Sequence, residues 1–403
     1  MKDPVSKEET ARSLNGNIGK LYAFKTLQWF LVIIPVIVPF YQAAGLSMAQ
    51  ILGLQAAFSL SLAILEIPSG YLADLLGRRK SLVLGAVCAT AGYALYCISD
   101  SFAGFLVAEL IMGAGSSFVS GADSALFYDT LLSSGREGEF KRLEGRRGAL
   151  GNFSESAASI LGGLLAVVSL RLPVYVETAV VACSIPLAWS LVEPKSHGAG
   201  RARAGLTDLA KTVQYALHGH KELKWLLIYG AVMGASTLTM VWFVQPYFKL
   251  TGLPLGWYGV VWAGFNLSVG LFSLAAHRVE GRLGRRTILM LLLPLSATAY
   301  LVVGFFPSLW ILPVFFTFYF VRGLGGPLLS AYMNPLIPSE RRATILSVNA
   351  LLVRVLFSIM GPLAGALSDR SSLPIALRVL GASFFHLGLP AIYLLTRKKT
   401  LAD

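Results

Sequence analysis

The sequence is poor in charged and chemically reactive side chains. Asp, Glu, Lys and Arg make up 14% of the 403 residues, and there are 5 His and 3 Cys. Cys88, Cys97 and Cys183 fall in apolar stretches without metal-ligand spacing, so we expect buried thiols and no metal site. No G-x-x-x-x-G-K-[ST] phosphate-binding loop and no nucleophile- or His-based catalytic group occurs. These absences argue against an enzyme, a cofactor and ATP-driven transport by this chain alone.

Long apolar runs, in contrast, are abundant. Hydrophobic residues make up 55% of the chain, more than a water-soluble protein of this length could bury. About 20 apolar residues in a helix cross a bilayer core about 30 Å thick, and helices satisfy their own backbone groups in lipid. The sequence predicts an all-α membrane protein with twelve transmembrane helices at residues 21–41, 50–72, 81–99, 102–127, 147–169, 172–192, 223–247, 256–276, 287–305, 308–331, 343–367 and 374–396.

The net charge of +13 is explained by topology and not by a nucleic-acid partner. Most of the 34 Lys and Arg residues lie at the termini or in alternate loops. This positive-inside bias predicts a multi-pass protein of the plasma (inner) membrane with both termini in the cytoplasm. Residues 1–20 have no signal-peptide core, so we expect the first helix to act as the insertion signal. The lipid bilayer is therefore an expected partner, and nucleic acid is not.

A short basic loop occurs twice. Leu76-Gly77-Arg78-Arg79 returns 207 positions later as Leu283-Gly284-Arg285-Arg286, each time between two apolar runs. A repeat of this kind is typical of a duplicated membrane unit. We predict an N-terminal bundle at 1–192, a cytoplasmic linker at 193–222 and a C-terminal bundle at 223–403.

The first loop resembles a known family motif. Residues 70–80 read Gly-Tyr-Leu-Ala-Asp-Leu-Leu-Gly-Arg-Arg-Lys, which matches G-x-L-x-D-x-x-G-R-[RK]-x of the major facilitator superfamily. The preceding residues 66–69 and the stretch 120–147 look most like its drug-efflux branch, which includes macrolide exporters. The resemblance covers the whole chain. It implies two pseudo-symmetric six-helix bundles that transport by alternating access.

The resemblance also implies a cytoplasmic latch. In the family, the carboxylate at the end of helix two meets helix eleven, and a carboxylate at the inner end of helix four joins the network; Asp123 or Asp129 fits that place. A carboxylate can accept hydrogen bonds from a helix N-terminus and pair with Arg. The alternative is a loop that only fixes topology. The predicted latch residues are Gly70, Asp74, Gly77, Arg78, Asp123 and Asp129.

The second loop departs from this pattern. By the same offset, Asp74 corresponds to Gly281 and Gly70 to His277, with Glu280 one place early. We therefore expect one latch, and a topological anchor in the C-terminal half. Two further departures weaken a drug–proton antiport assignment: Glu109 stands where the family's exporters often have Arg, and Ser159–Gly163 lacks the antiporter proline.

Ionisable side chains inside predicted spans are costly and are therefore functional candidates. Glu66, Glu109 and Glu155 are candidate proton-coupling groups, because a carboxyl group in a partly dry cavity can exchange protons near neutrality. Internal salt bridges, such as Glu66 or Glu155 with Arg354, are the alternative. The candidate substrate-cavity residues are Lys25, Gln28, Asn152, Arg322 and Arg354.

Together these features predict a secondary transporter, and we expect it to act as a monomer. The favoured activity is proton-coupled export of a small amphipathic organic molecule by antiport. Uptake or exchange of a specific anionic metabolite, bound by Arg322 and Arg354, is the alternative within transport. A membrane sensor or scaffold that retains the fold is the non-transport alternative, which the intact loop and the buried charges disfavour.

Overall fold

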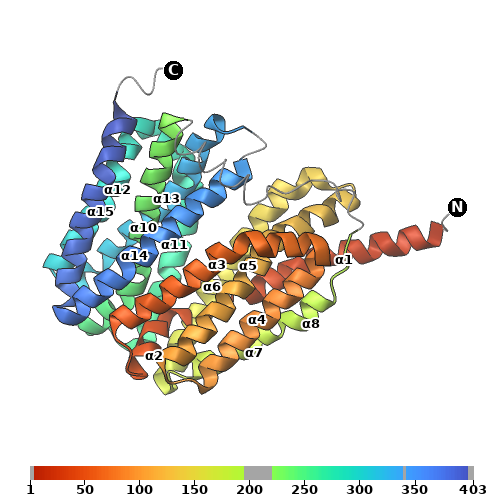
Figure 1. Cartoon of the computed structure of the whole chain (residues 1–403), viewed down its shortest axis with the longest axis horizontal. Helices are drawn as coiled ribbons and strands as arrows, with labels where there is room; N and C mark the ends of the chain where they lie inside the picture. The colour runs from red at the N-terminus through yellow and green to blue at the C-terminus, as the bar shows by residue number, and fades with distance from the viewer. Residues whose placement is uncertain (1–3, 195–219, 339–341, 398–403) are drawn as a thin grey trace. The chain divides into compact units, whose positions relative to one another are not determined.

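The computed structural model describes residues 4–194, 220–338 and 342–397, and every regular element in these ranges is helical. Figure 1 shows their arrangement. The first half contains α1 (Pro4–Gln28), η1 (Ile34–Val36), α2 (Ile37–Ala43), α3 (Met48–Leu76), α4 (Arg78–Ile98), α5 (Phe102–Ser133), η2 (Glu137–Glu139), α6 (Phe140–Val168), α7 (Leu172–Ala182) and α8 (Ser184–Trp189). The second contains α10 (Lys221–Leu250), α11 (Leu255–Leu283), α12 (Arg285–Phe305), η4 (Leu309–Phe315), α13 (Phe316–Met333), η5 (Asn334–Leu336), α14 (Arg342–Arg370) and α15 (Leu373–Thr396).

Within the described residues, 11 helical segments are long and apolar enough to cross a membrane. The first predicted span, at 21–41, is not among them, so the prediction of one continuous helix there is wrong. Instead α1 ends at Gln28, a non-helical stretch follows, and η1 and α2 complete the run. Pro35 is consistent with the break, because proline donates no backbone N–H to the residue four positions earlier and disfavours helical geometry in the residue before it.

The chain forms two compact units. Unit 1 comprises Met1–Val36 and Ala57–Arg203, and unit 2 comprises Ile37–Ala56 and Ala204–Asp403. The first two turns of α3 thus pack with unit 2, and the rest of that helix with unit 1. Most of the predicted linker, residues 195–219, lies outside the described residues.

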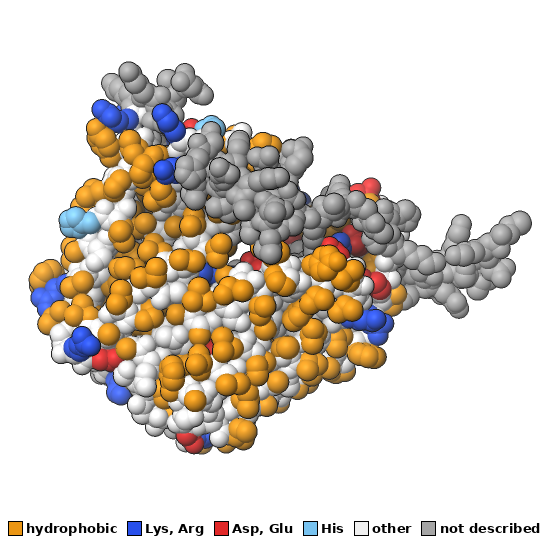
Figure 2. Space-filling view, viewed as in Figure 1, with side chains coloured by type: hydrophobic (Ala, Val, Ile, Leu, Met, Phe, Trp, Pro, Cys, Tyr) orange, Lys and Arg blue, Asp and Glu red, His pale blue; other side chains and the backbone are white. Residues whose placement is uncertain are grey.

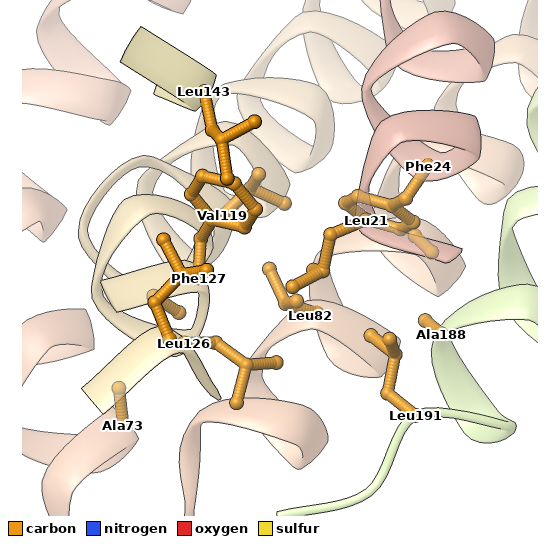
Figure 3. Close-up of a cluster of buried hydrophobic side chains, with 13 residues drawn as sticks. Leu21, Phe24, Ala73, Leu82, Val119, Leu126, Phe127, Leu143, Ala188 and Leu191 are labelled. Atoms are coloured by element: carbon orange, nitrogen blue, oxygen red, sulfur yellow. The ribbon is translucent and has the colours of Figure 1, made fainter. Parts of the chain in front are cut away.

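Unit 1 has a buried apolar cluster beneath its Gly-Arg-Arg loop (Figure 3). Leu21 and Phe24 of α1 meet Leu82 of α4, and Phe127 of α5 completes the centre of the cluster; all four side chains are fully buried. Between helices in lipid, such contacts stabilise through close packing rather than removal from water. This cluster is the scaffold on which the charged groups of the loop are placed.

Small residues allow the helices of each unit to approach closely. A Cβ at Gly85 of α4 would lie 2.8 Å from the Gly115 carbonyl oxygen of α5, and one at Gly92 would lie 2.2 Å from Met112. In unit 2, a Cβ at Gly381 of α15 would lie 2.9 Å from a carbonyl oxygen of α12. Such small-residue contacts are typical of helix packing in membranes.

Large apolar side chains remain on the surface of the helices. Trp310 is 91% exposed and Leu274 is 82% exposed, and hydrophobic side chains predominate on the face drawn in Figure 2. A water-soluble protein rarely exposes contiguous apolar patches of this kind, whereas a lipid-facing protein does.

Candidate functional site

The first Gly-Arg-Arg loop is a tight turn closed by a carboxylate. Gly77 joins α3 to α4 with φ +95°, a conformation that favours glycine. Glu193, just after α8, accepts hydrogen bonds from the backbone N–H groups of Arg78 at 2.9 Å and Arg79 at 2.7 Å. These N–H groups begin α4 and have no partner inside the helix. Glu193 therefore caps α4, and its carboxylate lies close to Gly77, where a Cβ would be 3.3 Å away.

The same loop holds an ion pair. The Arg78 guanidinium pairs with the Asp129 carboxylate of α5 and donates to the Ala125 carbonyl oxygen at 2.7 Å. Asp74, one turn before Gly77 on α3, is exposed and lies within electrostatic range of Asp129. We call Asp74, Arg78, Asp129 and Glu193 the first loop cluster. Of the two helix-four carboxylates that the sequence left open, Asp129 is the one that joins the loop.

Asp123 belongs to a different group of charges. It pairs with Arg147 of α6 and lies 3.4 Å from the Lys25 ammonium group of α1. Arg147 also pairs with Glu144 at 2.8 Å, and its side chain is 1% exposed. Lys25, predicted to line a substrate cavity, is thus part of an ion-pair group in unit 1. We call Lys25, Asp123, Glu144 and Arg147 the Arg147 cluster.

The second loop has its own anchor. Gly284 turns with φ +76°, as Gly77 does in the first loop. Arg285, which corresponds to Arg78 by the repeat, pairs with Glu222 in the first turn of α10. Its guanidinium also lies over the ring of Tyr332, 4.7 Å from the centroid. No carboxylate of α13 takes the place that Asp129 has in the first loop, so the two loops use different partners within the described residues.

At the end of unit 2 opposite this loop, a carboxylate caps α3. The two oxygens of Asp369, near the end of α14, accept hydrogen bonds from the N–H groups of Met48 at 2.9 Å and Ala49 at 2.8 Å. One turn earlier, a Cβ at Gly365 would lie 2.6 Å from the Met48 carbonyl oxygen. The N-terminus of α3 therefore lies directly against α14.

Repeat-related residues also contact one another in unit 2. The Val38 N–H donates to the Gln245 side chain at 2.9 Å, and Lys249 donates to the Gln42 side chain at 3.4 Å. Both pairs are separated by 207 positions, the offset between the two loops.

The three predicted proton-coupling carboxylates all belong to unit 1. Glu109 of α5 is 3% exposed, whereas Glu66 of α3 and Glu155 of α6 are half-buried. Near Glu109, the Ser61 hydroxyl donates to the Leu110 carbonyl oxygen at 3.0 Å, which ties α3 to α5. Glu109 therefore lies where two helices pack, and the geometry alone allows a packing role as well as a proton-binding one.

The remaining cavity candidates are divided between the units. Gln28 ends α1 and Asn152 lies on α6, both half-buried in unit 1. In unit 2, Arg322 of α13 is exposed and Arg354 of α14 is half-buried. Gly70, the first residue of the loop motif, is half-buried in α3.

Comparison with known proteins decides the family. The family model described as Major Facilitator Superfamily matches residues 21–362. The chain belongs to the major facilitator superfamily. This membership makes it a membrane-embedded, non-enzymatic transporter of a small-molecule substrate.

Individual relatives are more distant. The inner membrane transport protein YajR of Escherichia coli K12 is 27% identical over 119 residues, which are 29% of this chain and 26% of YajR. The chain therefore matches about a quarter of the length of this curated relative. The comparisons assign no branch, so the drug-efflux branch stays a prediction.

Solved structures share the fold at low identity. The nucleoside transporter NupG has a TM-score of 0.78 at 13% identity, covering 94% of this chain and 99% of NupG. A bacterial homologue of the human lysosomal transporter Spinster has a TM-score of 0.68 at 15% identity, covering 98% of each chain. A POT family transporter in complex with 5-aminolevulinic acid has a TM-score of 0.69 at 13% identity, covering 96% of this chain and 97% of that one. At these identities the likeness shows a common fold.

Sequence reasoning missed four charged residues that the structure places at junctions. Glu193 lies at the start of the predicted linker and Arg147 in the family-like stretch 120–147, and neither position indicates a partner. Asp369 lies near the C-terminal end of an apolar helix, which does not indicate that it caps another helix. Glu177, on α7, does carry a signal, because a carboxylate within an apolar span needs a partner.

Proposed function

We propose that the protein is an inner-membrane secondary transporter, with both termini in the cytoplasm, that exports a small amphipathic organic molecule in exchange for protons. Two six-helix bundles, 1–192 and 223–403, joined by the linker 193–222, would alternate in exposing the substrate. The observation that carries this proposal, beyond family membership, is the difference between the two loop clusters. In the first loop, Arg78 pairs with Asp129 and its backbone N–H binds Glu193, with Asp74 within electrostatic range of Asp129. In the second loop, Glu222 and Tyr332 secure Arg285.

This difference supports a single cytoplasmic latch. Asp74 is exposed near the end of α3. The neighbouring Arg78 and Asp129 form an ion pair and are more buried than Asp74. A cluster with an excess of carboxylate oxygens can accept further N–H donors from an approaching helix N-terminus. Such a contact can form and break as two packed bodies rock. We therefore assign the latch to Gly70, Asp74, Gly77, Arg78 and Asp129, and the Arg147 cluster to internal stability.

The proton part of the proposal rests on carboxylates within the spans. Glu109 is almost fully buried, and Glu66 and Glu155 are half-buried. Buried carboxyl groups bind protons more readily than exposed ones, because burial disfavours the charged form. These carboxyl groups are therefore the candidates for coupling transport to a proton gradient.

Uptake or exchange of an anionic metabolite is the second candidate. Arg322 and Arg354 favour it, since an arginine in a membrane span can bind a carboxylate or phosphate. NupG transports nucleosides and the POT family transporter binds 5-aminolevulinic acid, which makes polar metabolites sensible competitors in a test. A sensor or scaffold would move none of these compounds.

Purified full-length protein in proteoliposomes separates the candidates. The probes are ethidium as an amphipathic cation, uridine, and 5-aminolevulinic acid, each with and without an imposed pH gradient. The proposal expects ethidium to accumulate in the acidic lumen and the polar probes to remain outside. Accumulation of uridine or 5-aminolevulinic acid alone would favour the metabolite transporter, and no gradient-dependent movement of any probe would favour the scaffold.

A further inference from the structure

The first membrane segment contains a break whose backbone groups need partners. The last turn of α1 is closed by the N–H groups of Trp29 and Phe30, which donate to the carbonyl oxygens of Lys25 and Leu27 at 3.1 and 3.4 Å. From Phe30 to Ile33 the chain is not helical, and η1 then begins at Ile34. In lipid, a free backbone N–H costs several kcal/mol, so the N–H groups of the break require acceptors from elsewhere in the protein.

Glu177 of α7 supplies the acceptor. Its Oε2 accepts a hydrogen bond from the Val32 N–H, and the carboxyl group is also bonded by the Ile33 N–H. The Glu177 side chain is 0% exposed. On the other side of the break, a Cβ at Gly162 of α6 would lie only 1.9 Å from the Val32 carbonyl oxygen. The unwound segment is thus held between a carboxyl group and the backbone of a glycine.

The second oxygen of Glu177 has no partner. Within the described residues, Oε1 is buried without a hydrogen bond, and no Lys, Arg or His forms an ion pair with the carboxyl group. From α4, the groups that face this region are Tyr93, which is within electrostatic range of Glu177, and Cys97, whose sulfur lies 3.3 Å from the Thr178 hydroxyl. From α5, Glu109 is also in electrostatic range of Tyr93, and α6 contributes the uncharged Gly162.

An ionised carboxylate is costly in such a place. Moving a carboxylate out of water costs several kcal/mol, and only a counter-charge or a set of hydrogen bonds offsets that cost. The Val32 N–H serves Oε2, and within the described residues Oε1 is buried without a hydrogen bond. A proton on Oε1 removes the charge and leaves Oε2 as the carbonyl oxygen that accepts the Val32 N–H bond. No group of three or more His, Cys, Asp or Glu that could hold a metal ion occurs among the described residues, which favours a proton over a metal cation.

We infer that Glu177 is a proton-binding site of the transport cycle, loaded in the conformation seen here, with the break at residues 29–33 as its movable cover. The inference rests on the proposed proton coupling and adds a group that sequence analysis did not assign. Loss of the proton leaves a carboxylate that must reach water. Water reaches it only when the break moves away from α6 and α7, so proton exchange and the conformation of the first segment are linked.

Infrared difference spectroscopy of the purified full-length protein tests the site without any cargo. The probe is a pH change in H₂O and D₂O, read at the C=O stretch of protonated carboxyl groups. We expect wild-type protein at neutral pH to show a component, a carboxyl C=O band, that shifts in D₂O and is absent in Glu177→Gln, whose amide oxygen can still accept the Val32 N–H bond. Glu137→Gln, at an exposed position in η2, is the matched control and should keep the component. Glu177→Asp, with a shortened side chain, should shift its frequency.

The outcomes separate this inference from the proposed function. An unchanged spectrum in both Glu177→Gln and Glu177→Asp overturns the assignment. Loss of the component on replacing choline chloride by sodium chloride at constant pH would make the site a sodium site and also overturn it. If the component behaves as expected but wild-type proteoliposomes show no proton-driven flux, the site stands and proton-coupled export fails. If wild-type protein shows that flux and Glu177→Gln retains it at a comparable rate, the role of Glu177 in transport is wrong.

Discussion

Asp369 and Met48 lie 321 positions apart, and the carboxylate of one accepts the backbone N–H of the other at 2.9 Å. The second oxygen of Asp369 binds the Ala49 N–H at 2.8 Å. The carboxylate therefore satisfies the first two N–H groups of α3 and lies at the positive end of that helix dipole. This cap therefore joins two segments of unit 2 that lie far apart in the sequence, the start of α3 and the end of α14.

Removing this cap should destabilise the protein measurably. We expect Asp369→Ala to lower the free energy of unfolding by about 1 kcal/mol, the usual loss for a helix N-terminal cap. Asp369→Asn keeps one acceptor oxygen and should lose less. Denaturant titration of the purified protein measures both. Asp100→Asn is the control: its side chain is 69% exposed and pairs with Arg171 at the surface, so its effect should stay within about 0.5 kcal/mol. Equal effects of Asp369→Ala and Asp100→Asn would contradict the capping role.

The two carboxylates near the end of α5 should respond differently to neutralisation. Asp123→Asn removes one of the two carboxylates that pair with the buried Arg147, and because Glu144 remains we expect a cost below the roughly 3–5 kcal/mol of a fully broken buried pair. Asp129→Asn affects a partly exposed pair in the first loop cluster. We expect Asp123→Asn to lower expression and thermal stability. We expect Asp129→Asn to fold normally but to transport at least about tenfold more slowly, which corresponds to a barrier higher by about 1.4 kcal/mol. Thermal unfolding and flux, measured on the same samples, distinguish the two variants. Normal flux in Asp129→Asn would contradict the assignment of Asp129 to the latch.

Gly162 should tolerate no side chain. Gly162→Ala places a methyl group against the Val32 carbonyl oxygen, so α6 and the break must move apart, at about 1–3 kcal/mol. Gly148→Ala on the same helix is the control, because nothing lies within 4 Å of its Cβ position. Helix propensity predicts that this control is neutral or stabilising by up to about 1 kcal/mol. Thermal shift of the two variants checks the difference, and a stable Gly162→Ala protein would argue against the tight packing of the break.

The two loop glycines offer a comparison at repeat-related positions. Both combine a positive φ with an extended ψ, a region populated almost only by glycine, so alanine at either costs about 1–3 kcal/mol in backbone strain. A Cβ at Gly77 also meets the Glu193 carboxylate at 3.3 Å, whereas nothing lies within 4 Å at Gly284. We expect Gly77→Ala to be the more destabilising by about 1 kcal/mol, the value of the α4 cap, and to slow transport more. Denaturant titration measures the difference in stability between the two variants, and a flux assay measures the difference in transport rate. A larger loss of stability or of transport in Gly284→Ala than in Gly77→Ala would contradict the unequal roles of the loops.

Much of the fold follows from the sequence, because span length and hydropathy are read directly from residue types. The break at residues 29–33 does not follow from hydropathy, since its residues are as apolar as a helix in lipid. Pro35 carried the signal, but proline is common in membrane helices and does not by itself give the position of a break.

The candidate site was predictable only in part. The loop motif identified Arg78 and offered Asp123 or Asp129, but choosing between them requires knowing which face of α5 meets the loop. Glu193 and Asp369 bind backbone N–H groups. Nearly every residue has such a group, so the sequence does not show which ones a carboxylate will bind. The partner of Glu177 is likewise the backbone of Val32 and Ile33, which appears only once the break is placed beside α7.

The most direct test of the account is cargo-dependent proton movement in proteoliposomes. Wild-type protein is reconstituted with an acidic lumen that contains a pH-sensitive dye, and ethidium is added outside. We predict that the lumenal pH rises as ethidium accumulates, and that Asp129→Asn slows both changes together, at least about tenfold. Ethidium accumulation without a change in lumenal pH, or no cargo-dependent proton movement with any of the three probes, would contradict proton-coupled export.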